Sequence, residues 1–250
     1  ALSLLRGANF PVLNLDLIYG LPGQTAGSWR YSLREALRYA PEELYLYPLY
    51  VRPLTGLGRS HKEWDDDRLA LYRDGRDLLL SEGYEQVSMR MFRRGVARSE
   101  GPAYCCQTDG MVGLGCGARS YTRGLHYSLD YAVHPKSVKA IIADYLSNTA
   151  DDFAHARHGF ALDGDEQRRR FLLQSVLNAD GLDAGAYRAR FGSDPGDDFP
   201  DLHTFAGLGL LELDDGCWAP TARGLERSDA LGPWLFSPRV RSLMETYDTK

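Results

Sequence analysis

Residues 14–25, Asn-Leu-Asp-Leu-Ile-Tyr-Gly-Leu-Pro-Gly-Gln-Thr, constrain the fold more than any other stretch of the chain. Their first half is an apolar run interrupted only by Asn14 and Asp16, which predicts a strand buried on both faces. The Gly-Leu-Pro-Gly turn that follows leads into a helix. Because an acid in such a strand costs several kcal/mol unless it is paired, we expect Asp16 to have a partner. Ligands of α/β proteins bind at such strand ends, so this end is a candidate site.

Helix-like and strand-like segments alternate after this turn. Apolar positions that recur every three or four residues predict helices at residues 28–40, 65–81 and 136–148. Strands are predicted at residues 44–50 and 84–92. Strands separated by helices of this length favour right-handed βαβ units and a mostly parallel sheet or barrel.

The pattern changes near residue 165. Helices are predicted at residues 171–177, 182–191 and 202–208, and residues 210–221 indicate a hairpin with an Asp-Gly turn. Helices followed by such a wing are typical of a small winged-helix-like α+β domain. We therefore predict an α/β fold with two domains. Residues 1–150 would form the sheet or barrel with its flanking strands, and residues 160–250 a helical, winged-helix-like domain.

The charge distribution argues against several classes of function. The net charge of −5 over 250 residues divides into +2 for residues 1–150 (18 basic, 16 acidic) and −7 for residues 151–250 (11 basic, 18 acidic). No basic stretch resembles a nucleic-acid footprint, and no run approaches the roughly 18 apolar residues that a membrane span needs. The chain does not open on a secretory leader. We therefore expect a cytoplasmic protein with neither a nucleic-acid nor a membrane partner.

The four cysteines are too few for a disulfide framework in a chain of this length. Adjacent cysteines rarely ligate one zinc ion, and no second Cys-x-x-Cys or nearby His pair completes a set of four ligands. Buried thiols are therefore favoured over a metal site. The cysteines are Cys105, Cys106, Cys116 and Cys217.

Polar residues near the predicted strand ends leave alternatives open. Asp16 either accepts hydrogen bonds from local backbone amides or directs its carboxylate at a ligand hydroxyl or amine. Residues 20–25 lack the Lys and the spacing of a phosphate-binding loop, so composition alone indicates a turn. Arginines on the same side would suit an anionic substrate, because guanidinium groups match carboxylates. They are Arg52, Arg59, Arg90 and Arg119.

Taken in order, these segments resemble the oxygen-independent coproporphyrinogen III oxidase-like family of radical S-adenosylmethionine (SAM) proteins. Residues 8–25 are similar to that family's NIDLIYGLPGQT strand and turn, and residues 44–55 to its next strand and P-x-T loop. The resemblance extends over nearly all of residues 8–228. Further matches are residues 65–84 (the DDD…L…GY helix), residues 112–118 (a GIGCGA-like segment), and Thr221 with Gly224 in the C-terminal domain.

The resemblance implies the later part of a partial (β/α) radical SAM barrel, open where the strands end and where SAM and substrate meet. It assigns SAM contacts to Asp16 and Tyr50, and the neighbouring Gly20 and Gln24 complete the candidate cofactor-binding set. The family reduces a [4Fe-4S] cluster, cleaves SAM and uses the resulting radical to remove a hydrogen atom, which in the oxidase leads to propionate decarboxylation. The candidate substrate-binding residues are Arg90, Tyr104, Gln107 and Arg119.

Two departures from the family pattern shape these expectations. The family's Cys-x-x-x-Cys-x-x-Cys cluster motif is absent, so we expect no metal ligand in this chain and a [4Fe-4S] cluster bound by residues encoded upstream. We expect this N-terminally truncated chain to be inactive alone. Residues 100–105 lack the His of the haem-chaperone branch's HNxxYW stretch, whereas residues 104–107, Tyr-Cys-Cys-Gln, are closer to the oxidase's GYTTQ.

These features together predict a radical SAM oxidoreductase whose substrate is unassigned, with a porphyrinogen or another carboxylate as the substrate class and a separate electron donor. The alternative is a non-catalytic haem-binding protein or haem chaperone of the same family. A third possibility is a degenerate fragment without activity. No residue is assigned as catalytic.

Overall fold

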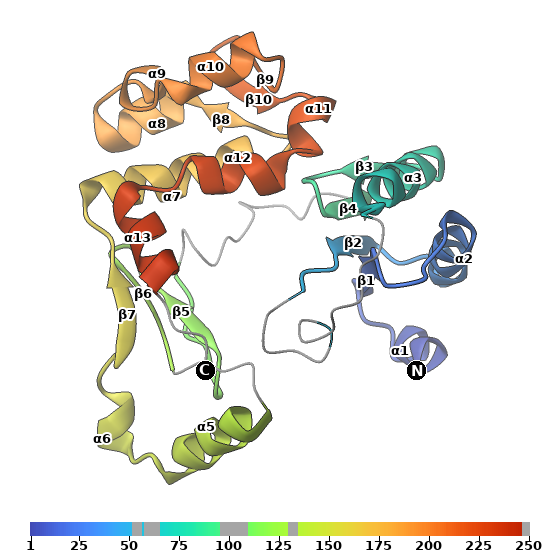
Figure 1. Ribbon diagram of the computed structural model, residues 1–250, viewed down its shortest axis with the longest axis horizontal. Coiled ribbons are helices and arrows are strands. Elements are labelled where there is room, and N and C mark those ends of the chain that lie inside the picture. Colours follow the sequence, from blue (N-terminus) through green and yellow to red (C-terminus); the bar gives the residue numbers. More distant parts are fainter. Residues whose placement is uncertain (52–56, 58–65, 96–109, 130–134, 247–250) are drawn as a thin grey trace. The chain divides into compact units, whose positions relative to one another are not determined.

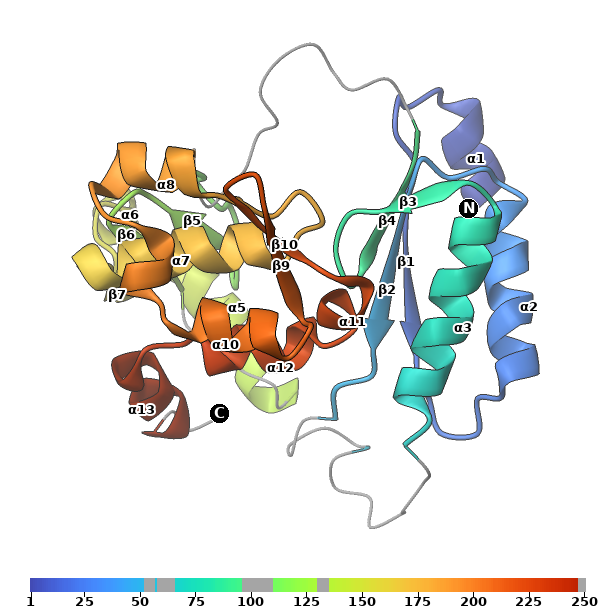
Figure 2. The same cartoon turned by 90° about the horizontal axis from the view of Figure 1, so that it is seen from above.

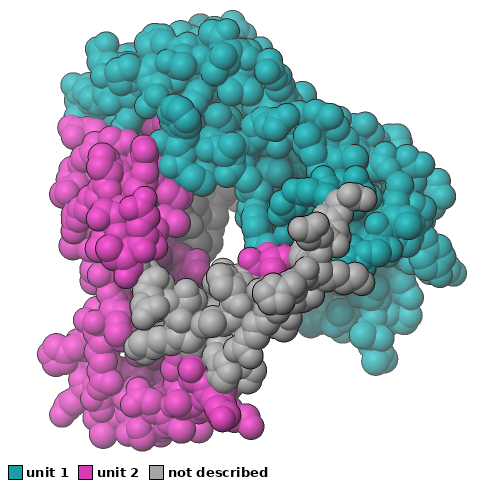
Figure 3. Space-filling view, viewed as in Figure 1, with its two compact units in different colours: residues 1–50, 62–98, 173–234 teal, residues 51–61, 99–172, 235–250 magenta. Residues whose placement is uncertain are grey.

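The computed structural model describes residues 1–51, 57, 66–95, 110–129 and 135–246 (Figure 1). The chain divides into two compact units, coloured separately in Figure 3. Unit 1 consists of Ala1–Tyr50, Lys62–Arg98 and Leu173–Trp234, and unit 2 of Val51–His61, Ser99–Leu172 and Leu235–Lys250. The division into domains near residue 150 stays a prediction.

Unit 1 contains a four-stranded sheet in the order β1-β2-β4-β3. Strands β1 (Asn14–Tyr19) and β2 (Glu43–Pro48) are parallel, whereas β2 pairs with β4 (Met91–Arg94), and β4 with β3 (Tyr84–Gln86), in antiparallel fashion. The prediction of one strand at residues 84–92 and of a mostly parallel sheet was therefore wrong. Ser88 reverses the chain there, because its hydroxyl accepts hydrogen bonds from the backbone amides of Arg90 and Met91 at 3.3 and 3.1 Å.

Helices α2 (Ala26–Leu37) and α3 (Arg68–Ser81) cover one face of this sheet (Figure 2). Thr25 caps α2 by accepting from the Ser28 amide, and the Ser28 hydroxyl accepts from the Thr25 amide in return. Such a reciprocal pair satisfies two amides at a helix start. The fully buried residues of this layer form the core, which includes Tyr19, Trp29, Leu33, Leu44, Leu46, Tyr72, Leu79 and Phe92.

On the opposite face of the sheet, the side chains of β1 remain exposed. Asn14, Asp16 and Ile18 are exposed along β1, while the alternate residues Leu15 and Leu17 are half-buried and Tyr19 is buried. The prediction that β1 is buried on both faces was wrong for this reason. Side chains alternate across a strand, so a single helical layer buries only every second residue.

The C-terminal part of unit 1 combines short helices with a small antiparallel sheet of order β8-β10-β9. The predicted hairpin is confirmed, with β9 (Leu211–Asp214) and β10 (Cys217–Pro220) joined through Asp215 and Gly216 at φ 44° and 76°. Two consecutive positive φ angles are typical of Asp-Gly hairpin turns. The winged-helix assignment itself stays a prediction. The other elements are β8 (Leu182–Asp183), α8 (Ala184–Phe191), α9 (Pro195–Asp198), α10 (Asp201–Gly207), α11 (Ala222–Leu225) and α12 (Ser228–Trp234).

Unit 2 holds a second antiparallel sheet, of order β5-β6-β7. Its strands are β5 (Arg119–Tyr121), β6 (Leu125–Ser128) and β7 (His158–Ala161). Among the described residues, no helix is both long and apolar enough to cross a membrane. The remaining helices of the chain are α1 (Leu2–Gly7), α5 (Pro135–Ser147), α6 (Ala150–Phe153), α7 (Gly164–Val176, shared by both units) and α13 (Pro238–Thr246).

Candidate functional site

The uncovered face of the unit 1 sheet carries a carboxylate beside two aromatic rings. We call Asp16, Ile18, Tyr45 and Tyr47 the open face. The register pairs Asp16 with Tyr45 and Ile18 with Tyr47, so the four side chains lie on the same side of neighbouring strands. The rings of Tyr45 and Tyr47 stack with centroids 6.0 Å apart and planes 12° from parallel.

Asp16 is exposed and, within the described part of the chain, makes no hydrogen bond. The expectation of a buried, partnered acid was wrong, because no helical layer desolvates this face. Its negative charge nevertheless affects the pKa of two neighbouring tyrosines. Burial and then nearby carboxylates raise the pKa of Tyr45, with Glu43 acting more strongly than Asp16, and burial and Asp16 raise the pKa of Tyr47. Of the two alternatives for Asp16, hydrogen bonds to local backbone amides are not found among the described residues, and a contact with a ligand stays a prediction.

The turn after β1 is built by two of the predicted cofactor-binding residues. Gly20 has φ +83°, and a Cβ there would lie 2.4 Å from Cγ of Arg68. Gln24 accepts from the Gly20 amide at 2.7 Å and donates to the Ile18 carbonyl at 3.4 Å. Arg68 in turn donates to the Leu49 carbonyl at 3.2 Å. Gly20 and Gln24 therefore fix the edge at which the parallel strands β1 and β2 end.

Near the end of β2, four residues form a second polar group, which we call the Arg90 cluster: Tyr47, Tyr50, Arg90 and Asp229. The Tyr50 hydroxyl donates to Oδ2 of Asp229, and Nη2 of Arg90 donates to the Tyr50 oxygen at 2.8 Å and to Oδ1 of Asp229. The guanidinium of Arg90 lies 5.7 Å from the centroid of the Tyr47 ring and 5.6 Å from that of Tyr50. Burial and the hydrogen bond to Asp229 raise the pKa of Tyr50 to about 12.

The structure brings together two of the residues predicted from the sequence. Tyr50 and Arg90, predicted for the cofactor and the substrate, are hydrogen-bonded to each other. Arg119 lies exposed on β5 of unit 2. Asp229 was missed, since it lies 139 residues from Arg90 and no local pattern marks it. The predicted residues outside the described ranges are Arg52, Arg59, Tyr104, Gln107, Cys105 and Cys106.

An ion pair with a buried carboxylate joins the segment before α12 to helix α3. Glu226, only 7% exposed in its side chain, accepts from Arg73 at 2.7 and 2.9 Å and from Arg76 at 3.4 Å. The hydrogen bond from Arg73 lowers the pKa of Glu226, and the charges of both arginines add to this effect. Residues 226–229 therefore contact the helical layer through Glu226 and the Arg90 cluster through Asp229.

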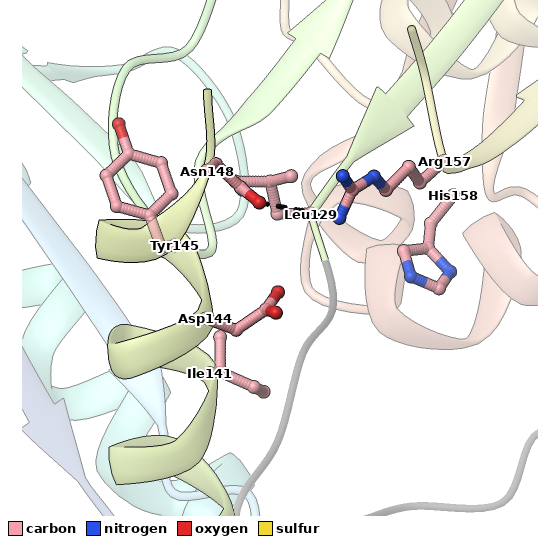
Figure 4. A pocket seen from close by; sticks show the side chains of 7 residues that line it. All are labelled: Leu129, Ile141, Asp144, Tyr145, Asn148, Arg157 and His158. Carbon is pink, nitrogen blue, oxygen red and sulfur yellow. Dashed lines mark hydrogen bonds between the residues drawn. The ribbon is translucent and has the colours of Figure 1, made fainter. Parts of the chain in front are cut away.

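The described residues offer no metal centre, and a small pocket lies in unit 2. These residues contain no cluster of three or more His, Cys, Asp or Glu side chains that could hold a metal ion. Cys116 is exposed, so the prediction of a buried thiol was wrong for it, and Cys217 is half-buried. A pocket in unit 2 lies between α5 and β7, with Asp144 and His158 in its lining (Figure 4). Its volume of about 100 Å³ is below the range for ligand pockets.

Comparison with known proteins relates the chain to two kinds of relatives. Residues 162–226 match the HemN C-terminal domain. The oxygen-independent coproporphyrinogen III oxidases of Pseudomonas aeruginosa and Escherichia coli are 26% and 27% identical, and the alignments cover 84% and 88% of this chain but 48% and 50% of those proteins. The heme chaperone HemW of Escherichia coli is 32% identical over 47% of this chain and 32% of its own length.

A solved structure shows the same fold. The coproporphyrinogen III oxidase HemN from Escherichia coli, described as a radical SAM enzyme, superposes with a TM-score of 0.72 and 22% identity over 94% of this chain and 57% of that one. This chain thus spans about half the length of the oxidases it matches. The resemblance predicted from the sequence motifs is confirmed: the chain is related to the oxygen-independent coproporphyrinogen III oxidases and to HemW, with a mixed α/β fold like that of HemN and a HemN C-terminal domain at residues 162–226.

Proposed function

We propose that this chain provides the SAM-facing sheet and the C-terminal domain of a radical SAM oxidoreductase of the coproporphyrinogen oxidase type. The observation that carries the proposal is the extent of the matches. The oxidase of Escherichia coli aligns with 88% of this chain, whereas HemW of the same organism aligns with 47%. The proposed substrate is a porphyrinogen or another carboxylate, and a separate electron donor is required.

The open face supplies the groups that would hold SAM. The Asp16 carboxylate is free to accept hydrogen bonds from hydroxyl or ammonium groups, and the stacked rings of Tyr45 and Tyr47 offer π surfaces that attract a cation. SAM held there would supply the radical chemistry by which such an enzyme removes a hydrogen atom from its substrate. The described residues do not fit the cluster itself, since they bring no three thiolates together.

Anaerobic reconstitution of the encoded full-length protein with iron and sulfide tests the proposal. Under reducing conditions we expect 5′-deoxyadenosine to accumulate when SAM is present, measured by chromatography. Asp16→Asn should lower this yield strongly while leaving the iron content unchanged. A reconstituted wild-type protein that carries the cluster but forms no 5′-deoxyadenosine would rule out a radical enzyme.

The second candidate function is haem binding, as the name of the heme chaperone HemW indicates for that relative. It is favoured by the identity of 32% to HemW, which exceeds the 27% identity to the oxidase of the same organism. A titration with haem distinguishes the two functions. A Soret band at one haem per chain, together with no SAM cleavage, would support the haem-binding function, whereas SAM cleavage without stable haem binding would support the oxidoreductase.

A further inference from the structure

The Arg90 cluster holds a carboxylate in the way that a protein holds a carboxylate ligand. Asp229 receives one hydrogen bond from the Tyr50 hydroxyl and one from Nη2 of Arg90, each to a different carboxylate oxygen. Arginine paired with a second donor is a common means of recognising carboxylates, because the guanidinium group offers several donors in a fixed plane. In this chain the carboxylate so recognised comes from the first turn of helix α12.

The two donors are held in place by contacts that do not involve Asp229. Arg90 lies over the rings of Tyr47 and Tyr50 and donates to the Tyr50 hydroxyl at 2.8 Å. The backbone of Arg90 is also fixed, because its carbonyl accepts from the Leu46 amide of β2 at 2.9 Å. The receptor made by Arg90 and Tyr50 would therefore persist if the Asp229 carboxylate were removed.

The donors can be reached from solvent. The side chains of Arg90 and Asp229 are 35% and 36% exposed, and Tyr50 is 52% exposed. The contact between Arg90 and Asp229 is thus that of a partly exposed ion pair, which contributes little net stability because water competes for both charges. A carboxylate that gains additional contacts elsewhere on the open face can replace it.

We propose that Arg90 and Tyr50 form a carboxylate-binding site whose internal occupant is Asp229, and that a ligand carboxylate takes the place of Asp229 when it binds. This inference rests on the proposed function only for the identity of the ligand. Under the proposed function, this carboxylate belongs either to the substrate or to the methionine half of SAM. The site itself is defined by the contacts of the Arg90 cluster.

Binding of propionate to the whole 250-residue chain tests the site. The titration is followed by amide NMR shifts of the ¹⁵N-labelled protein at constant ionic strength, with the uncharged propionamide as the ligand control. Asp229→Asn removes the internal competitor and should tighten propionate binding by up to about fivefold, the upper end of the effect expected from an exposed ion pair. Asp74→Asn is the charge control, since Asp74 is paired with Arg30 on the helical layer.

The expected pattern is tighter binding in Asp229→Asn, unchanged binding in Asp74→Asn and loss of binding in Arg90→Gln. Equal propionate affinity in Asp229→Asn and Asp74→Asn would overturn the proposal. So would weaker binding in Asp229→Asn, because that result means that Asp229 only positions Arg90. Because this assay involves no radical chemistry, its failure is distinguishable from a failure to form 5′-deoxyadenosine.

A parallel titration with SAM identifies the source of the carboxylate. If SAM supplies it, Asp229→Asn should also tighten SAM binding and Arg90→Gln should weaken it. If the substrate supplies it, both variants should bind SAM as the wild type does while their propionate affinities differ. Either result supports the site once the propionate pattern is obtained.

Discussion

The two faces of the β1-β2-β4-β3 sheet come from the same strands but have opposite character. On the covered face, Leu44, Leu46 and Phe92 are fully buried beneath α2 and α3. On the open face, Ile18 is 49% exposed and Asp16 has no hydrogen bond within the described residues. The same strands therefore supply both a buried face and an exposed face. Alternate residues provide the free energy of folding, and the residues between them remain available for a ligand.

Truncating an aliphatic side chain on each face gives the largest expected contrast. Leu46→Ala should lower the free energy of unfolding by about 2–5 kcal/mol, because it leaves a cavity in a fully packed core. Ile18→Ala, on the adjoining strand but the open face, should cost less than about 1 kcal/mol, since half of its surface is already in water. Urea unfolding followed by circular dichroism measures both. Equal losses would mean that the open face is buried in solution.

The ion pair between Glu226 and helix α3, on the covered face of the sheet, should make a pH-dependent contribution to the free energy of unfolding. Its folded pKa lies below the ordinary 4.5, so its contribution is present above pH 4.5 and is lost as the pH falls through the folded value. At pH 7, Glu226→Gln should cost about 2 kcal/mol, as expected for hydrogen bonds to a charged group. The difference in unfolding free energy between the wild type and the variant should shrink as the pH falls from 7 to 3. A constant difference across this range would contradict the role of the Glu226 charge.

Two glycines test the turn that follows β1. Gly20 and Gly23 both have positive φ, +83° and +77°, but only at Gly20 would a Cβ meet another residue, Arg68. Gly23→Ala should cost about 1 kcal/mol from backbone strain alone. Gly20→Ala should cost up to about 1 kcal/mol more, because Arg68 must move away from the Leu49 carbonyl. Thermal unfolding of both variants checks the order, and a Gly23→Ala variant less stable than Gly20→Ala would contradict it.

Local patterns in the sequence predicted the elements but not their burial. The strand at residues 14–19, helix α2 and the 211–220 hairpin follow from apolar periodicity and turn residues, which act over short distances. The exposure of Asp16 could not be predicted, because it depends on whether a second layer covers β1. Likewise, Tyr50 and Arg90 follow strands and could be proposed for a site. Their partner Asp229 comes from a helix far along the chain, so only the folded structure reveals it.

Equilibrium binding of SAM to the wild type and to Asp16→Asn tests the central claim that the open face is the cofactor-binding face. The substitution keeps the side-chain shape but removes the negative charge and replaces one of the two acceptor oxygens with an NH2 donor. We predict at least about tenfold weaker SAM binding, the effect of losing one hydrogen bond to a charged group. The free energy of unfolding should change by less than about 0.5 kcal/mol, because Asp16 is exposed. Unchanged SAM affinity in a folded Asp16→Asn variant would contradict the account.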